Sequence, residues 1–340
     1  MNGSYNLNLK YLTEIPDKLL NIEREEIYDL FPEPTLIHLK GNKPEALFLS
    51  TMLHGNEFTS FIVLKKLLNE YSKKNLPRDL IIFIGNTIAT SQGVRHLEDQ
   101  IDYNRIWEVG DTPEHKIADQ VISYAKEQQI FASIDIHNNT GINPLYGCIN
   151  SLEKDFLSLA SYFGDNTVYF TEPHNVQSMA FSKFCTSITI EAGLPGSSEG
   201  VEASYNFVKE ILEIDKLVEN KSRSVTEVYH TIGRIMIDSD STVDFDNSKS
   251  SPSDFSLVPT IDTKNFQLIK KFSKLGFAKS LSKIKIEDNN GNDISNDFLI
   301  LKDNELLTNR IFIPSMFTKD IYVMKEDCLG YIMEIMIPMN

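Results

Sequence analysis

ALFLSTMLHGNE, residues 46–57, joins an almost uninterrupted apolar run to a polar turn, and this combination decides the fold class. Such a run, followed by helically spaced Phe61, Leu64 and Leu68, predicts a strand covered on both faces and then a helix. Further apolar runs occupy residues 80–84, 131–136, 167–170 and 187–190, and helical patterns begin at residues 113 and 199. We therefore expect an α/β fold, with a mostly parallel (mixed) sheet and helices on both faces.

The pattern changes near residue 222, where short extended runs replace the alternation of strands and helices. These runs lie at residues 225–237, 280–286, 298–301, 311–314, 321–325 and 331–337. Residues 265–275 form one helical candidate among them, and the Ser- and Asp-rich residues 238–256 are expected to form a mobile loop. Because 340 residues suggest about two domains, we predict an α/β domain at 1–222 and a small, mainly β domain at 223–340.

Composition excludes several classes of protein. Lys and Arg number 33 against 48 Asp and Glu, a net charge of −15 that argues against nucleic-acid binding. The first twenty residues lack an apolar signal core, and no stretch reaches the ~18 apolar residues of a membrane span. Cys148, Cys185 and Cys328 lie far apart and form no C-x-x-C pair, which fits a reducing compartment. We expect a cytoplasmic protein without a membrane partner.

Ionisable residues follow three of the predicted strands. His54 and Glu57 follow the first, His137 ends the third, and Glu191 follows the fifth. Each of these residues alone would be ordinary. The carboxyl ends of parallel strands, however, meet at one edge of a sheet. Burial of all four ionisable side chains there would cost free energy, so their coincidence indicates a functional site. Two histidines and a glutamate are the ligands of a catalytic zinc site, which leaves a fourth position open. We therefore predict one Zn²⁺ per chain, held by His54, Glu57 and His137.

Four motifs in order resemble the succinylglutamate desuccinylase/aspartoacylase family of the zinc carboxypeptidase-like superfamily. They are His54-Gly55-Asn56-Glu57, Asn104-Arg105, Asp135-Ile136-His137-Asn138 and Ile190-Glu191-Ala192-Gly193. The similarity covers roughly residues 44–210. It implies a zinc carboxypeptidase-like catalytic domain followed by a small β domain.

The resemblance also implies roles for individual residues. Glu191 would act as the general base that activates a metal-bound water and then protonates the leaving amine. Arg105 and Arg95 would polarise the amide carbonyl or hold a substrate carboxylate, with Asn104 beside them and Asn138 following the histidine ligand. The function implied is zinc-dependent hydrolysis of a linear amide (C–N) bond. The substrate would be an N-acyl amino acid or a related small amide that carries a carboxylate.

Two departures from the family pattern affect substrate binding. The segment between Gly93 and Asn104 is about two residues longer than in the family, so Arg95 could be displaced. Lys183 is the only cation between Leu159 and Glu191, where members acting on acidic substrates carry an arginine. We therefore favour a substrate other than N-acetylaspartate or N-succinylglutamate over a substitution by Lys183.

Other interpretations remain open at this point. A metallocarboxypeptidase acting on small peptides would use the same metal ligands, and a non-catalytic metal-binding protein would need no Glu191. A carbohydrate or nucleotide binder would hold no metal. Asp135 could orient a ligand imidazole or simply end a strand, and Arg105 could pair with Asp102 or Glu108. The sequence also leaves open whether the β domain caps the cleft or joins copies in a homo-oligomer.

Overall fold

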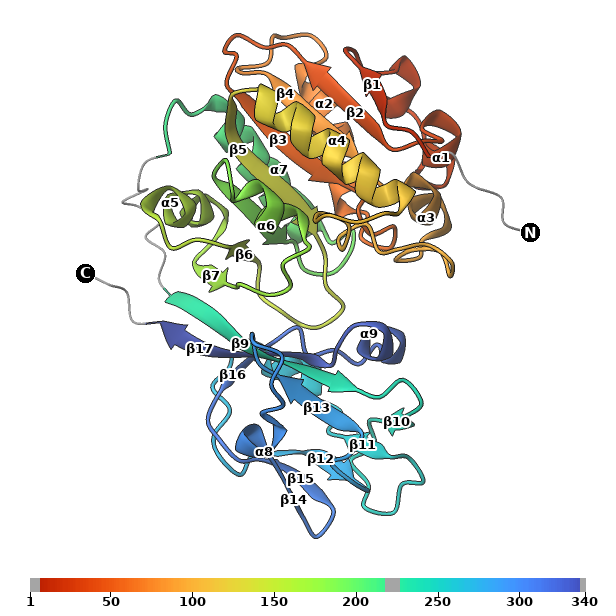
Figure 1. The fold of residues 1–340 in the computed structure, drawn as a ribbon, viewed down its shortest axis with the longest axis vertical. Helices are drawn as coiled ribbons and strands as arrows, with labels where there is room; N and C mark the ends of the chain where they lie inside the picture. The colour runs from red at the N-terminus through yellow and green to blue at the C-terminus, as the bar shows by residue number, and fades with distance from the viewer. Residues whose placement is uncertain (1–6, 218–226, 337–340) are drawn as a thin grey trace. The chain divides into compact units, whose positions relative to one another are not determined.

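A computed structural model describes residues 7–217 and 227–336, which fall into two compact units (Figure 1). The N-terminal unit contains the described residues up to Asn138 and those from Leu145 to 217. The C-terminal unit contains the segment Asn139–Pro144 and the described residues from 227 onward. The predicted boundary between residues 222 and 223 lies outside the described residues. Among the described residues, none of the helices combines the length and the apolar composition that a membrane span needs.

The N-terminal unit is built on a mixed sheet. Its strands lie in the order β1 (Lys10–Leu12), β2 (Thr35–Leu39), β4 (Leu80–Ile84), β3 (Ala46–Thr51), β5 (Ile130–His137), β8 (Ser187–Glu191), β6 (Tyr146–Ile149) and β7 (Asn166–Tyr169). The central strands β4, β3, β5 and β8 are parallel to one another. By contrast, β2 runs antiparallel to β4, and β6 runs antiparallel to β8. The mostly parallel sheet predicted from the apolar runs is confirmed.

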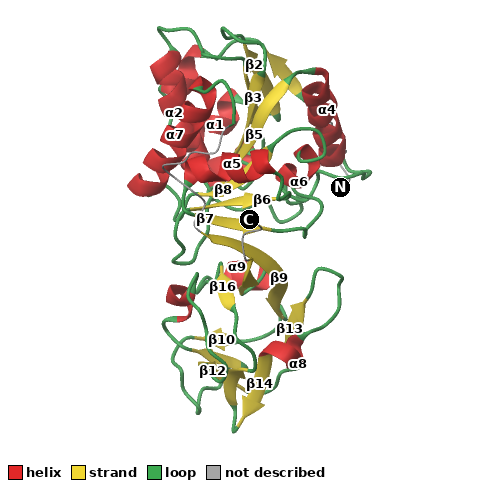
Figure 2. Cartoon of the chain, turned by 90° about the vertical axis from the view of Figure 1, so that its left-hand side faces the viewer, coloured by secondary structure: helices red, strands yellow, loops and turns green. Residues whose placement is uncertain are grey.

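Helices cover both faces of this sheet (Figure 2). Leu47 and Leu49 of β3 join one apolar core with α2 (Thr59–Tyr71), α5 (Lys154–Phe163) and α7 (Ser198–Glu213). Phe48 of the same strand joins a second core with α4 (Pro113–Glu127) and α6 (Gln177–Phe181). Successive residues therefore face opposite layers, as a strand buried on both sides requires. Shorter helices are η1 (Asp17–Leu20), η2 (Arg24–Glu26), α1 (Ile27–Leu30) and α3 (Thr87–Gln92).

Local capping fixes the ends of the longer helices. Thr112 accepts a hydrogen bond from the backbone of His115 at the start of α4, and Pro113 occupies the first turn. The helix expected to begin at residue 199 is α7, which ends at Glu213. Arg78, which is 1% exposed, donates to the carbonyl oxygens of Leu212 and Ile214 and so satisfies the last turn.

The C-terminal unit is mainly β, as predicted. β9 (Glu227–Ile237) pairs antiparallel with β17 (Gly330–Met336) and β13 (Ile284–Glu287), and β17 also pairs with β16 (Ile313–Ser315). A second sheet has the order β10 (Val243–Asp244), β11 (Phe255–Leu257), β12 (Lys274–Ala278), β15 (Glu305–Thr308) and β14 (Leu299–Lys302). The remaining elements are η3 (Ile261–Lys264), α8 (Ser295–Phe298) and α9 (Ile321–Glu326).

Three local predictions for this unit are wrong or incomplete. Residues 265–275 form no helix, because Ile269 bridges to Phe312 and β12 already begins within the segment. Residues 321–325 are helical instead of extended, because the Asp320 side chain accepts hydrogen bonds from the first turn of α9. Residues 238–256 contain β10 and the start of β11, and Asp244 accepts hydrogen bonds from Ser251 and Ser256.

Candidate metal centre

The turn after β3 holds two of the predicted ligands in a fixed backbone. Met52 adopts a left-handed conformation (φ 55°), which its hydrogen bonds to Ser60 Oγ at 3.0 Å and from Asn86 N at 2.7 Å stabilise. A Cβ on Gly55 would lie 2.1 Å from the carbonyl carbon of Ala89, so only glycine lets the chain pass here. The turn therefore directs His54 and Glu57 over the carboxyl edge of the sheet.

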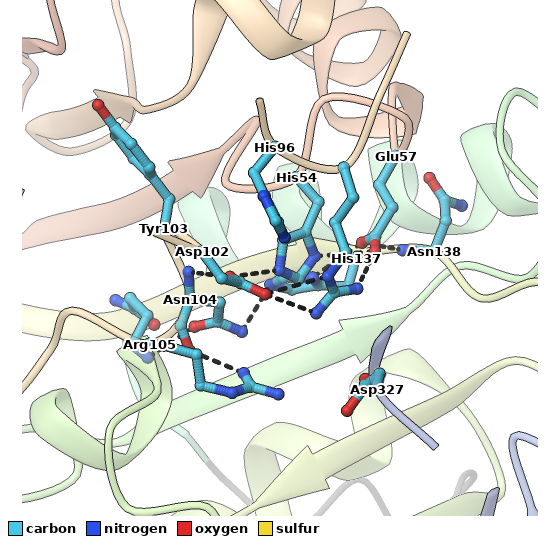
Figure 3. A network of polar contacts seen from close by, with 12 residues as sticks. His54, Glu57, His96, Asp102, Tyr103, Asn104, Arg105, His137, Asn138 and Asp327 are labelled. Carbon is cyan, nitrogen blue, oxygen red and sulfur yellow. Dashed lines mark hydrogen bonds and ion pairs between the residues drawn. The ribbon is translucent and has the colours of Figure 1, made fainter. Parts of the chain in front are cut away.

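The structure brings His54, Glu57 and His137 together, as the sequence predicts (Figure 3). The Nδ1 atoms of His54 and His137 each lie 2.8 Å from an oxygen of Glu57, and the two ring centroids are 4.8 Å apart. One possible ligand atom from each residue lies within 4.8 Å of the others, and all three side chains are buried. These three residues can hold a metal ion.

Two further carboxylates fix the orientation of the imidazole rings. His54 Nε2 lies 2.9 Å from Asp102 Oδ1, and His137 Nε2 lies 2.8 Å from Asp135 Oδ2. With a metal ion bound, the proton on each Nε2 would be held by its carboxylate, and each Nδ1 would offer its lone pair to the ion on the side where Glu57 lies. Histidines that bind metals are usually held in this way. The donors therefore fit the two nitrogens and one oxygen of a catalytic zinc site.

Asp102 is part of the candidate metal centre, although the sequence did not predict it there. It lies two positions before the Asn104-Arg105 motif, where the sequence suggests only an ion pair with Arg105. In the structure it bonds His54, and its other oxygen lies 2.9 and 3.0 Å from Arg95 Nη2 and Nε. The only sequence signal is its position beside that motif, because its contact with His54 spans 48 positions.

The predicted substrate-binding residues surround the cluster and are engaged in it. Arg95 reaches Asp102 and lies 3.5 Å from Glu57 Oε1, so the longer segment before Asn104 does not remove it from the site. Asn104 Nδ2 lies 3.3 Å from His137 Nε2, and Arg105 Nη1 donates to the Asn104 carbonyl at 2.9 Å. The backbone N–H of Asn138 donates to Glu57 Oε2 at 2.9 Å.

Glu191 lies beside the cluster because of strand register. In the parallel pair of β5 and β8, Glu191 is the Cα partner of His137, so both side chains leave the sheet on the same face. The Glu191 side chain is 6% exposed. A buried carboxylate that is not one of the three ligand residues therefore lies next to the His54–Glu57–His137 cluster.

Electrostatics favour ionised carboxylates at the centre. Burial alone would raise the pKa of Glu57, but the charges of His54 and His137 hold it well below its usual value. The pKa of Asp102 is likewise well below its usual value, because His54 and Arg95 outweigh its burial. Burial opposes protonation of His137, yet Asp135 and Glu57 raise its pKa well above the ordinary value. Deprotonated carboxylates are what metal binding requires.

Exchange of Asp102 for asparagine is expected to weaken zinc binding by about 10- to 100-fold, the usual effect of losing an outer hydrogen-bond partner. The amide keeps the size of the side chain but loses the charge that holds His54 and Arg95. Zinc affinity can be measured by competition with a chromophoric chelator, and Asp99→Asn, at an exposed position of the same loop, is the control. Equal affinities in the two variants would contradict this role.

The sheet order and the His-Glu-His cluster at its carboxyl edge define an α/β domain with a candidate metal centre. Residues 43–197 match the model described as "Succinylglutamate desuccinylase/Aspartoacylase catalytic domain", and this part of the chain belongs to that family. No curated protein sequence matches the chain.

Several solved structures share the fold at low sequence identity. The succinylglutamate desuccinylase from Chromobacterium violaceum is 16% identical, with a TM-score of 0.57 over 87% of this chain and 86% of its own. Murine aminoacylase 3 is 14% identical, with a TM-score of 0.54 over 87% and 96%. The succinylglutamate desuccinylase/aspartoacylase from Rhodobacter sphaeroides is 15% identical, with a TM-score of 0.56 over 87% and 88%. These likenesses establish the fold.

Proposed function

We propose that the protein is a zinc-dependent hydrolase of a linear amide bond in an N-acyl amino acid or a related small amide. The observation that carries the proposal is the His54–Glu57–His137 cluster with Glu191 in register beside His137. A metal-binding protein without catalysis has no use for that additional buried carboxylate. Membership of a deacylase family supports the same reaction class.

Each residue has a distinct task in this mechanism. A Zn²⁺ ion held by His54, Glu57 and His137 would polarise a carbonyl and lower the pKa of a water molecule. Glu191 accepts the proton of the attacking water and returns it to the leaving nitrogen, so its net charge is restored in each cycle. Arg105 stabilises the negative charge that develops on the carbonyl oxygen.

The proposal is tested by metal analysis joined to a hydrolysis screen. We expect about one zinc per chain and hydrolysis of N-acyl amino acids. A chelator should abolish the activity and added zinc should restore it, because attack by unactivated water is slow. Full activity in metal-free protein would contradict the mechanism. Faster cleavage of dipeptides than of N-acyl amino acids would identify a metallocarboxypeptidase instead.

We also propose that the protein works in the cytoplasm. Cys148, Cys185 and Cys328 are all free thiols, which supports a reducing compartment. The division into a domain at 1–222 and a domain at 223–340 stays a prediction.

A further inference from the structure

We propose that Tyr124 is an acceptor site for acyl groups, with His38 as the general base that activates its hydroxyl and Asp79 as the residue that orients His38. The acyl group would come from an activated donor, such as a thioester or an aryl ester. All three residues belong to the N-terminal unit, but none of them belongs to the candidate metal centre. The inference therefore goes beyond the proposed hydrolase and does not depend on it.

The three side chains meet at the amino edge of the sheet, opposite the metal cluster. His38 pairs with Ile81 near the end of β2, and Asp79 directly precedes β4. β4 has five residues, so at ~3.3 Å per residue it alone separates the two edges of the sheet by about 13 Å. This group of residues is therefore separate from the metal cluster.

The packing of α4 on the sheet brings Tyr124 to His38. Leu36 and His38 leave β2 on the same face, and Leu36 belongs to the apolar core that α4 covers. Tyr124 follows the buried Val121 of α4 by three positions, so it lies on the face of the helix that contacts this core. The rings of His38 and Tyr124 meet edge to face, with their centroids 5.9 Å apart.

A chain of hydrogen bonds connects a buried carboxylate to the phenol. Asp79 Oδ2 lies 2.9 Å from His38 Nε2, and His38 Nδ1 lies 2.6 Å from Tyr124 Oη. Lys40 Nζ donates to Asp79 Oδ2 at 2.8 Å, and the backbone N–H of Gly41 donates to Oδ1 at 2.8 Å. Asp79 and His38 are both buried. A hydroxyl within reach of a base that a third group orients is the arrangement of an activated nucleophile.

The protonation states suit a proton transfer from Tyr124 to His38. Burial alone would raise the pKa of Asp79, but hydrogen bonds from Lys40 and the Gly41 backbone hold it below its usual value. With Asp79 ionised, a proton on Nε2 of His38 is held by the carboxylate, and Nδ1 can accept the hydroxyl of Tyr124. Partial burial raises the pKa of Tyr124, although Lys40 opposes the rise. The hydroxyl therefore stays protonated near neutral pH and needs a base in order to react.

The transfer step is balanced without a metal or an oxidant. The Tyr124 oxygen attacks the carbonyl carbon of the donor, so that a C–O bond forms and the C–S bond of a thioester breaks. The proton of Tyr124 moves to His38 Nδ1 and then to the leaving thiolate. Because the product is an aryl ester, which is itself activated, an amide or an alkyl ester could not drive its formation. The donor must therefore be activated as well.

A second tyrosine at the same edge provides an internal reference. Tyr124 is half-buried, and the ring centroid of Tyr11 lies 5.6 Å from its own. Tyr11 is 50% exposed, so a reagent that reaches this edge meets Tyr11 first. Within the described ranges, the Tyr11 hydroxyl forms no hydrogen bond with a histidine. Faster reaction of Tyr124 would therefore come from His38 and not from better access.

Acetylation by p-nitrophenyl acetate tests the inference. The zinc-loaded protein is treated with the ester and digested, and mass spectrometry locates the acetyl groups. We expect Tyr124 to react on the order of 10²-fold faster than Tyr11, the scale of general-base catalysis. The p-nitrophenolate leaves as an anion, and His38 releases the proton to water. The rate at Tyr124 should show a normal solvent deuterium isotope effect and should not change when a chelator removes the metal.

Variants of the base and of the residue that orients it complete the test. His38→Gln should lower the rate at Tyr124 to that at Tyr11, because glutamine is not a base. His174→Gln, at an exposed position, is the matched control and should leave the rate unchanged. Asp79→Asn should also lower the rate at Tyr124, and Asp79→Glu, which keeps the charge, should retain more of it. Circular dichroism checks the fold of each variant, and the isotope effect in the unmodified protein tests proton transfer even if a variant fails to fold.

Four results would each overturn the inference. They are equal rates at Tyr124 and Tyr11, acetylation of Lys40 in place of Tyr124, an undiminished rate in folded His38→Gln, and a rate at Tyr124 without an isotope effect. None of these results bears on hydrolysis at the metal centre, so the proposed function and this inference can fail separately.

Discussion

Exchange of Glu191 for glutamine is expected to lower turnover on the order of 10²-fold or more, the scale of a lost proton-transfer group. Glutamine has nearly the same size, so the side chain keeps its place opposite His137 in the register of β5 and β8. It cannot accept the proton of the attacking water. Because Glu191 is not one of the three clustered ligand residues, zinc should stay at about one per chain.

The measurement is steady-state turnover together with the zinc content of the same preparation. Glu199→Gln is a matched control, because Glu199 lies exposed on α7 after the same strand. The control should keep the activity of the unmodified protein. Undiminished turnover in Glu191→Gln would exclude Glu191 as the proton-transfer group, even if the zinc site proved correct.

Exchange of Glu57 for glutamine is expected to remove the metal and abolish activity. The two carboxylate oxygens of Glu57 lie 2.8 Å from the Nδ1 atoms of His54 and His137, so Glu57 joins the two histidines. An amide carries no charge and is a poor zinc ligand, so the loss of affinity should exceed the 10- to 100-fold typical of outer partners. Metal analysis after gel filtration should find well under one zinc per chain.

Glu98→Gln, an exposed change in the segment between Gly93 and Asn104, is the control for this variant. It should retain zinc and activity. Circular dichroism is needed beside the metal analysis, because Glu57 also receives the Asn138 backbone N–H and approaches Arg95. A folded Glu57→Gln protein with a full complement of zinc would show that the ion binds elsewhere.

The central strands could be predicted because their apolar runs leave few alternatives. β3, β4, β5 and β8 are buried on both faces, and the residues at their carboxyl ends must then meet at one edge. Short elements carry a weaker signal. β6 has only four residues and depends on antiparallel pairing with β8. The segment 321–325 contains Ile, Tyr and Val, which favour strands, but the Asp320 cap makes it helical.

In the candidate site, too, the residues at strand ends could be predicted from the sequence, and a residue in a loop could not. His54, Glu57, His137 and Glu191 are attached to predictable strand ends, so their gathering follows from the fold. The contacts of Asp102 with His54 and Arg95 come from a loop, where no periodicity fixes which way a side chain points. Lys183 shows the converse: it precedes β8, which starts at Ser187 and ends at Glu191, so only the direction of that strand places it at the edge of the sheet opposite Glu191.

The most direct test of the metal centre is an anomalous difference map from zinc-treated crystals, recorded at the zinc absorption edge. We expect one peak, ~2.0–2.2 Å from Nδ1 of His54, Nδ1 of His137 and a carboxylate oxygen of Glu57. A map without a peak among these three residues, or with its main peak at other side chains, would contradict this assignment of the metal ligands.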